Sequence, residues 1–203
     1  LSQFKDALKT KSGHTNAYID VSKAIEFSQK QHVIDPYLMG VLIGDGSITT
    51  NTISITNPSQ ELFDSLILPE TVKLADRKIH EGKCLTYGIS SIKHGQISCV
   101  TKELKQLNLF GKKSTEKHIP DDYLIDSIEN RISLLQGLND TEGYASGPDF
   151  EFSTSSRSLS IDYADLVRSL GGAAKITDRT TFYTYNGVKK AGHLSHRIRC
   201  VFP

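Results

Sequence analysis

Two nine-residue segments of this chain are nearly the same. Leu38–Gly46 reads LMGVLIGDG, and Leu135–Gly143 reads LQGLNDTEG. Each segment has helical spacing, a glycine at its third position, and an acid followed by glycine at its end. The two acids, Asp45 and Glu142, lie 97 positions apart, about the length of one small domain. The repeat therefore predicts two similar halves that bring two acids to one place.

The acids occupy the unfavourable end of each predicted helix. Gly46 and Gly143 are of the residue type that most readily takes the left-handed conformation ending a helix, so each acid is expected at a helix C-terminus. The helix dipole places about half a negative charge there, which repels an extra carboxylate by about 0.3–1 kcal/mol. A compensating cation is needed. A divalent metal bound by both carboxylates and by carbonyls of the last turns would supply it.

Small residues spaced by one helical turn indicate how the acids meet. Gly40 and Gly44 are four apart in the first segment, as are Gly137 and Thr141 in the second. Faces of small residues let two helix backbones approach closely, although each glycine costs up to about 1 kcal/mol of helix propensity. The two helices are therefore expected to pack side by side. The alternative is two ordinary buried helices with glycine caps, which the matching register of acid and glycine disfavours.

The rest of the chain repeats one order of elements, which predicts an α/β (α+β) fold. A helix beginning at Pro36, with Asp35 as its N-cap, opens the first half, and Ser127 is the corresponding N-cap in the second. Periodicity and turn residues in the first half predict strands at about 47–56, 73–79 and 85–91 and helices at about 60–68 and 101–107. In the second half they predict a helix ending at 142, a helix at about 160–170, and strands at about 150–154, 174–179, 181–185 and 196–202.

Charge is unevenly distributed along the chain. The 203 residues carry a net charge of +1, yet residues 151–203 hold eight basic side chains against four acids. Alternation along the C-terminal strands sends one polar set of side chains to a single sheet face, and a two-stranded ribbon fits a DNA major groove. We expect contacts with double-stranded DNA from Lys175, Arg179, Lys189, Lys190, Arg197 and Arg199. A sheet edge whose lysines resist aggregation is the alternative for any one of these residues.

Composition and cysteine use exclude several classes of protein. Apolar residues make up 37% of the chain and charged residues 23%, as in globular domains. No apolar run reaches the length of a membrane span, and the first residues contain no apolar signal core, so no membrane association is expected. Cys84, Cys99 and Cys200 have no paired spacing and are expected to be reduced thiols of an intracellular, cytoplasmic protein.

These features resemble the LAGLIDADG homing endonucleases, specifically the two-motif, monomeric kind found inside inteins. The motif is matched at Leu38, Gly40, Asp45 and Gly46, and again at Leu135, Gly137, Leu138, Asp140, Glu142 and Gly143. Residues 35–37, 117–120 and 166–172 also look like the intein-borne branch. The resemblance implies two pseudo-symmetric LAGLIDADG halves, each with an antiparallel sheet and helices, that form a saddle across DNA. It divides the chain into an N-terminal extension or linker (1–30), a first half (31–117) and a second half (118–203).

The resemblance also implies a function and a set of site residues. The implied activity is a site-specific double-strand break in a long DNA target, made by a monomer that is normally fused to a protein-splicing domain. Asp45, Glu142 and Lys117 are the expected catalytic residues. Mg²⁺ is the expected cofactor, bound by the carboxylates of Asp45 and Glu142 with the carbonyls of Gly44 and Thr141 as helpers. Lys117 is expected beside the metals, where it polarises water or steadies the transition-state charge.

Other interpretations of these residues stay open. A relative that keeps DNA binding but has lost cleavage would act as a regulator, and an RNA-binding intron maturase of this fold would prefer structured RNA. Two acids can also act as general acid and base, but that chemistry favours one carboxyl in an apolar pocket. Glu142 replaces the commoner aspartate and should bind metal with a longer reach. His193 and His196 have the spacing of a metal pair but are expected to be surface residues.

Overall fold

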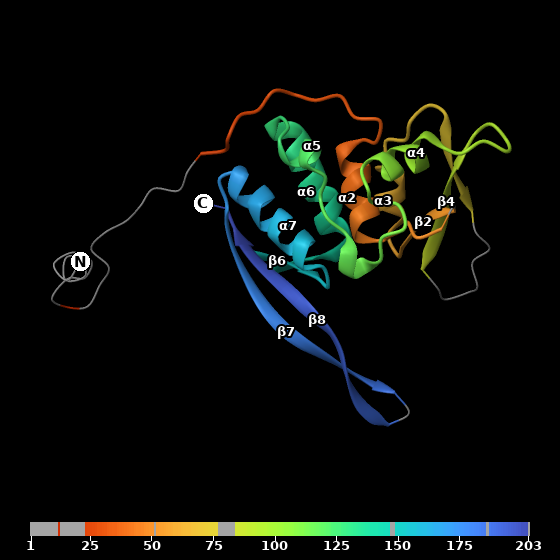
Figure 1. The fold of residues 1–203 in the computed structure, drawn as a ribbon. Helices are drawn as coiled ribbons and strands as arrows, with labels where there is room; N and C mark the ends of the chain where they lie inside the picture. Colours follow the sequence, from red (N-terminus) through yellow and green to blue (C-terminus); the bar gives the residue numbers. More distant parts are fainter. Residues whose placement is uncertain are drawn as a thin grey trace.

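The chain forms two halves in which one order of elements occurs twice (Figure 1). The computed structural model describes residues 12, 23–50, 52–76, 84–146, 149–185 and 187–202. The first half contains α2 (Pro36–Gly44), β1 (Gly46–Ser47), β2 (Ile53–Asn57), α3 (Gln60–Asp64), β3 (Val72–Asp76), β4 (Leu85–Ser91) and α4 (Cys99–Gln106). A linker follows with η1 (Ser114–Glu116) and α5 (Asp121–Leu124). The second half contains α6 (Ile128–Glu142), β5 (Gly143–Ser146), β6 (Asp149–Thr154), α7 (Arg157–Ser169), β7 (Ala173–Tyr185) and β8 (Val188–Val201).

Each half builds one four-stranded antiparallel sheet. The strand order is β1-β2-β4-β3 in the first sheet and β5-β6-β8-β7 in the second, so corresponding strands occupy corresponding positions. The register also corresponds, because Gly46 lies opposite Ile55 in the first sheet and Gly143 lies opposite Phe152 in the second. The predicted α/β fold, with two antiparallel sheets and helices, is confirmed.

Several elements differ in extent from the prediction. The strand expected at 47–56 forms the two strands β1 and β2, and the strand expected at 196–202 begins at Val188 as β8. The helix expected at 60–68 ends at Asp64. It could not have included residue 68, because Pro69 disfavours helical geometry in the residue before it. The strands expected at 174–179 and 181–185 form the single strand β7. An irregularity between Thr180 and Phe182 interrupts its pairing with β8, but pairing resumes on the far side.

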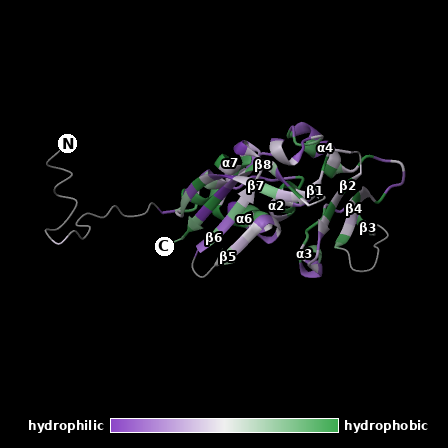
Figure 2. Ribbon diagram, turned by 90° about the horizontal axis from the view of Figure 1, so that it is seen from below, coloured by the Kyte–Doolittle hydropathy of each residue, from purple (hydrophilic) through white to green (hydrophobic). Residues whose placement is uncertain are grey.

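Helices α2 and α6 lie side by side between the two sheets (Figure 1, Figure 2). A Cβ on Gly40 would lie 2.4 Å from the carbonyl oxygen of Leu134, and one on Gly137 would lie 2.2 Å from the carbonyl oxygen of Tyr37. The facing atoms belong to the backbone, so neither position has room for a larger side chain. The predicted close packing through small residues is confirmed.

Gly46 and Gly143 end their helices differently from the prediction. Neither is among the described residues with positive φ, and Gly143 has the extended angles φ −85° and ψ 151°. Each glycine is instead the first residue of a strand. A Cβ on Gly46 would lie 2.3 Å from the oxygen of Leu42, and one on Gly143 would lie 2.5 Å from the oxygen of Asn139. The prediction of left-handed caps is therefore wrong. Glycine is needed because the chain leaves each helix through a space too narrow for a side chain.

The predicted N-caps of both acid-bearing helices are confirmed. The Asp35 carboxylate accepts hydrogen bonds from the backbone N–H groups of Tyr37 and Leu38. The Ser127 hydroxyl accepts one from the N–H of Asn130. These contacts satisfy donors that the first turn of a helix leaves without partners.

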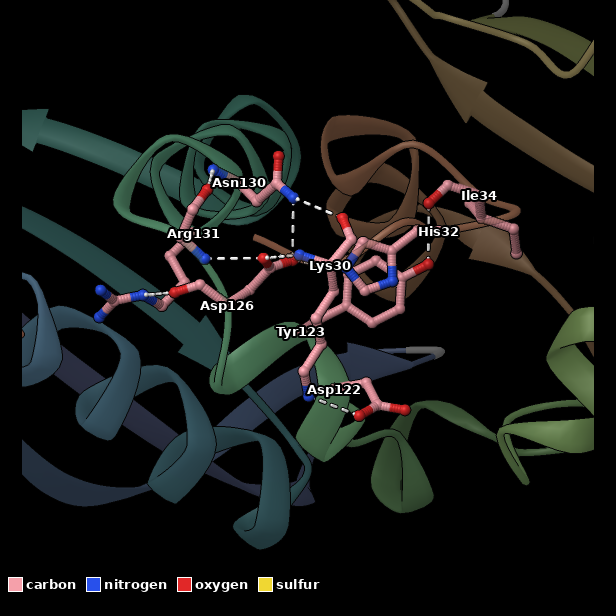
Figure 3. Close-up of polar contacts among 9 residues, drawn as sticks. Lys30, His32, Ile34, Asp122, Tyr123, Asp126, Asn130 and Arg131 are labelled. Carbon is pink, nitrogen blue, oxygen red and sulfur yellow. Dashed lines mark hydrogen bonds and ion pairs between the residues drawn. The ribbon is translucent and has the colours of Figure 1, made fainter. Parts of the chain in front are cut away.

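A buried polar network holds residues 23–34, which have no regular secondary structure, against the second half (Figure 3). The Asp126 carboxylate is fully buried, accepts from the N–H of Lys30 (2.8 Å), and bonds to Nε2 of His32 (2.5 Å). The fully buried Arg131 donates from Nε to the Asp126 carbonyl (2.9 Å). Every charged group of this network has a hydrogen-bond partner, as burial requires.

Part of the predicted N-terminal extension therefore packs onto the fold. The N–H of Ile25 donates to the carbonyl of Ser169 at the end of α7 (2.8 Å). Most of the extension falls on residues 1–11 and 13–22, which lie outside the described residues. The domain boundaries after residues 30 and 117 stay predictions.

The described residues also bear on membranes and thiols. Within that part of the chain, no helix is long and apolar enough to cross a bilayer. Cys84, Cys99 and Cys200 are free thiols. Burial raises the pKa of Cys200 to about 12, which makes this thiol unreactive at neutral pH.

Candidate active site

Asp45 and Glu142 stand at the ends of the paired helices. Asp45 is the C-cap of α2, and Glu142 is the last residue of α6. Burial raises the pKa of Glu142, the Asp45 carboxylate raises it further, and the ammonium of Lys117 lowers it. The structure thus brings all three predicted catalytic residues within electrostatic reach of one another.

The Lys117 ammonium lies at the C-terminal end of α2. Its Nζ donates to four backbone carbonyl oxygens at 2.8–3.2 Å, which belong to Leu42, Ile43, Gly44 and Gly46. Burial lowers the pKa of Lys117 to about 8, against the carboxylates of Asp45 and Glu142, which raise it. The side chain is therefore an ammonium at neutral pH. The chain itself supplies part of the positive charge that two acids at helix C-termini require.

The linker that carries Lys117 is fixed to the second half. The hydroxyl of Ser156, the N-cap of α7, donates to the Lys117 carbonyl (2.6 Å). Two residues further on, the N–H of Ile119 donates to Oδ2 of Asp162 (3.0 Å). Lys117 therefore has its backbone on the second half and its ammonium on the first, so its position depends on how the halves pack.

Asn57 is a site residue that sequence reasoning missed. It ends β2 and is 5% exposed. Its Nδ2 donates to Oδ2 of Asp45 (2.7 Å), and its Oδ1 accepts from the N–H of Ser59 (2.9 Å). The second bond sets the orientation of the amide, because only the oxygen accepts. A polar residue ending a strand carries no distinctive signal in one sequence; only the pairing register places it beside the acid.

The oxygens at the helix ends fit a hard divalent cation. Mg²⁺ is commonly held by one or two carboxylates together with waters and substrate phosphates, and Asp45 and Glu142 supply two carboxylates. Gly44 and Thr141 meet across the helix pair, since a Cβ on Gly44 would lie 1.9 Å from Oγ1 of Thr141. The Gly44 carbonyl is shared with Lys117. Among the described residues, no three His, Cys, Asp or Glu side chains cluster as a metal site. The metal roles of all four residues stay predictions.

Four of the predicted DNA-binding residues share one face of the second sheet. Lys175 lies opposite Arg199 in the β7–β8 pairing, and Arg179 lies opposite Ser195. Arg197 falls between them on β8. Since side chains alternate along a strand, these residues point to one side. The alternate residues of β8 are buried against the core.

Acids on the neighbouring strand partly neutralise this basic face. Arg197 forms an ion pair with Glu151 (3.3 Å), and Nε of Arg199 donates to Oδ2 of Asp149 (2.9 Å). Both arginines are at least 43% exposed, so their ion pairs are weak and exchangeable. A phosphate that approaches either arginine competes with a carboxylate already in place.

The two remaining predicted lysines lie near the tip of the long β7–β8 hairpin, which extends away from the body of the molecule (Figure 1). Lys189 Nζ lies 4.7 Å from the ring centroid of Phe182, and Lys190 Nζ lies 4.9 Å from that of Tyr185. Both rings are exposed. The stacking keeps each ammonium close to the ribbon and available to solvent.

The two histidines of the candidate metal pair have different environments. His193 is exposed, as predicted, and lines a cavity of about 310 Å³ beside Glu142. His196 is buried, and its Nδ1 bonds to Oδ1 of Asp178 (2.7 Å). The prediction of a surface position is therefore wrong for His196, because this position of β8 faces the core.

Solved structures of the homing endonuclease I-DmoI share the fold of this chain. Mesophilic I-DmoI variants match with a TM-score of 0.50 and 15% sequence identity, over 83% of this chain and 88% of theirs. I-DmoI in complex with DNA and Ca matches with a TM-score of 0.52 and 14% identity, over 82% of this chain and 81% of the other. This chain has the I-DmoI fold. A variant of I-DmoI with its target DNA in the presence of Mg matches with a TM-score of 0.50 and 14% identity, over 82% and 87% of the two chains.

A curated protein is also similar in sequence. The replicative DNA helicase DnaB of Mycobacterium intracellulare is 24% identical over 151 residues, which are 74% of this chain and 21% of the helicase. The chain with the I-DmoI fold thus spans about a fifth of the length of that relative. No protein-family model matches the chain.

Proposed function

We propose that this chain is a monomeric, site-specific homing endonuclease of the LAGLIDADG type that hydrolyses one phosphodiester bond in each strand of a long DNA duplex. The observation that carries the proposal is the pair of acids at the ends of α2 and α6, with the Lys117 ammonium acting on both. The I-DmoI fold supports it, because I-DmoI has been solved with DNA and with divalent ions. One chain contains both acids, so a monomer is sufficient.

The proposed mechanism assigns a separate task to each group of residues. The basic face of the second sheet holds phosphates of the duplex, which places a scissile phosphate over the helix ends. Asp45 and Glu142 would hold the divalent cation, Mg²⁺, which when bound neutralises phosphoryl oxygens and activates water. The Lys117 ammonium keeps the end of α2 in place and adds positive charge beside the phosphate as negative charge develops there.

We also propose that the chain is the endonuclease region of an intein. The match to a replicative helicase supports this, because it covers only a fifth of the helicase and the matching chain has a nuclease fold. An endonuclease inserted in the helicase accounts for both facts. Cleavage of an uninterrupted helicase gene would then start copying of the element into it.

Plasmid cleavage tests the proposal. The plasmid carries an uninterrupted replicative helicase gene, in which the sequences on either side of the insertion point are joined directly. It is incubated in Mg²⁺ or in EDTA. We expect one double-strand break that requires the metal. Asp45→Asn and Glu142→Gln should each abolish the break and still bind the plasmid in Ca²⁺.

Asp140→Asn is the matched control for the two acids. Asp140 also lies in the last turn of α6, but its carboxylate accepts from the Tyr37 hydroxyl (2.7 Å) and is exposed. This variant should cut like the wild type. Cleavage by Asp45→Asn at the wild-type rate would refute the metal site. A chain that binds DNA without cutting it would be a regulator, and one that prefers structured RNA would be a maturase.

A further inference from the structure

One position near the acids is structurally equivalent in the two halves but is occupied by a different residue type in each half. The strand after each acid pairs with the next strand at Ile55 in the first half and at Phe152 in the second. Two positions further along these strands are Asn57 at the end of β2 and Thr154 at the end of β6. The common register makes Asn57 and Thr154 structurally equivalent.

Both residues perform the same local task at the start of the next helix. The N–H of Ser59 donates to Oδ1 of Asn57 (2.9 Å), and the N–H of Ser156 donates to Oγ1 of Thr154 (3.1 Å). These serines are the N-caps of α3 and α7. Supporting the serine therefore requires an acceptor oxygen, which asparagine and threonine both provide.

Only Asn57 has a second polar group directed at the acid of its half. Its Nδ2 donates to Asp45 (2.7 Å). No hydrogen bond reaches the Glu142 carboxylate from the residues that the structure describes. The cavity of about 310 Å³ is lined by both Thr154 and Glu142, so space is open on that side of the glutamate.

We propose that Asn57 is a positioning residue for Asp45, that Thr154 leaves Glu142 without equivalent support, and that the two DNA strands are therefore cut at unequal rates. This inference rests on the proposed endonuclease function. The two halves repeat one order of elements and one strand order, and the two strands of a duplex are likewise equivalent, so each acid faces one strand. The strand facing Asp45 is cut first.

The physical reason is the freedom of the two carboxylates. A hydrogen bond to a charged group fixes the carboxylate of Asp45 before a cation arrives. Glu142 has an additional rotatable bond and loses more conformational freedom when it binds. Its half of the site must be ordered during binding, which slows the chemistry on the strand it faces.

Strand-resolved cleavage tests the order of cutting. A target duplex carries a different label on each strand, and single-turnover reactions are followed in Mg²⁺. The wild type should accumulate a nicked intermediate in one strand. Equal rates on both strands would refute the inference and leave the endonuclease function standing, whereas a chain that cuts neither strand would refute the function itself.

Exchanging the two residues assigns the effect to them. Asn57→Thr should slow the first cut about ten- to a hundred-fold, the range for losing one hydrogen bond to a charged group, and slow the second cut by a smaller factor. Thr154→Asn should speed the second cut, because the new amide extends into the cavity beside Glu142. The double exchange should reverse the order of nicking. The strand that faces the unaltered half of the site is the internal control of each variant.

Metal binding provides a readout separate from cleavage. Binding of Mn²⁺ to the DNA complex, measured by paramagnetic resonance, should weaken in Asn57→Thr and strengthen in Thr154→Asn. If Asn57 had a purely structural role, Asn57→Thr would lower the melting temperature of the protein and leave its Mn²⁺ affinity unchanged. That result would refute the inference. If Asn57→Thr does not fold, Thr154→Asn tests the proposal alone. A Thr154→Asn protein with unchanged Mn²⁺ affinity and an unchanged rate of the second cut would refute it.

Discussion

At the scale of single residues, Lys117 both adds positive charge beside the two acids and holds the end of α2 in place. An ammonium has three N–H groups, and that of Lys117 has four carbonyl oxygens within 2.8–3.2 Å. Its N–H groups are thus directed at the end of α2. In this arrangement Lys117 contributes through its positive charge and its hold on the helix end, and not by giving up a proton.

We expect Lys117→Met to reduce cleavage in Mg²⁺ by about a hundred-fold or more, the scale for removing one preorganised electrostatic group from an active site. Lys117→Arg should not restore activity, because a planar guanidinium does not match four converging carbonyls. Single-turnover rates measure both variants. Lys113, on the same linker, is exposed, so Lys113→Met should cut normally. A Lys117→Met protein as fast as the wild type would contradict the assigned role.

Asp126 predicts a pH dependence of folding. Burial raises the pKa of this carboxyl, but hydrogen bonds from His32, Lys30, Asn130 and Ser127 outweigh burial and lower the pKa overall. The folded pKa therefore lies below the unfolded value of about 3.9. The carboxylate contributes stability that is present above that value and is lost as the pH falls through the folded pKa.

Asp126→Asn should lower the free energy of unfolding by about 1–3 kcal/mol at pH 7, because the new amide directs a donor at groups that now donate. The difference from the wild type should shrink below about pH 3.9. Urea unfolding at several pH values measures it. Asp122, whose side chain is 67% exposed and pairs with Lys30 Nζ, is the control, and Asp122→Asn should unfold at nearly the same urea concentration as the wild type, because exposed ion pairs contribute little. A constant difference at all pH values would show that the carboxylate charge is not what stabilises the network.

At the scale of secondary-structure elements, the α2–α6 pair determines where the acids lie. Gly137→Ala would place a methyl group 2.2 Å from the Tyr37 carbonyl oxygen, and backbone atoms cannot move away cheaply. We expect a loss of about 1–3 kcal/mol of stability from overpacking, together with loss of cleavage as the helix ends separate. Thermal unfolding and plasmid cleavage measure the two effects.

Gly88 in β4 is the control for this substitution. It is also buried, but a Cβ there would lie 3.6 Å from its nearest neighbour, the Ala75 oxygen, which is an ordinary contact. Gly88→Ala should therefore stay within about 0.5 kcal/mol of the wild type. If the two alanine variants behaved alike, the close approach of the helices would not be the reason for glycine at 137.

At the scale of the whole molecule, a net charge of +1 coexists with a basic sheet face and a basic hairpin. Phosphate contacts release counterions, so DNA affinity should fall as salt increases, with a slope of about 0.9 per contact. Replacing Lys189 and Lys190 by alanine should reduce the slope by about 0.9 for each lysine. Binding titrations in Ca²⁺ at several salt concentrations measure it. Lys102 lies on α4, outside the second sheet, and Lys102→Ala is the control that should leave the slope unchanged. If the wild type, the double lysine variant and this control all had the same slope, the hairpin would not contact DNA.

Much of the helical framework was predictable because its signals are local. Asp35 and Ser127 are N-caps, and a cap is recognised from a few neighbouring residues. The spacing of Gly40 from Gly44, and of Gly137 from Thr141, was enough to indicate the close helix packing that the structure has. The predicted conformations of Gly46 and Gly143 are wrong because a glycine after a helical segment, judged from its neighbours alone, is typical of a left-handed helix cap. Their extended geometry is set by the strand each one begins.

By itself, the sequence determined that two acids recur at matching helix ends and that the chain repeats one α/β order, because both are patterns of neighbouring residues. Tertiary structure alone decided what surrounds the acids. Asn57 reaches Asp45 through strand pairing, Lys117 reaches the α2 carbonyls from more than seventy positions away, and His196 is buried by its place on β8. Such contacts depend on the register and packing of distant segments, which no local pattern encodes.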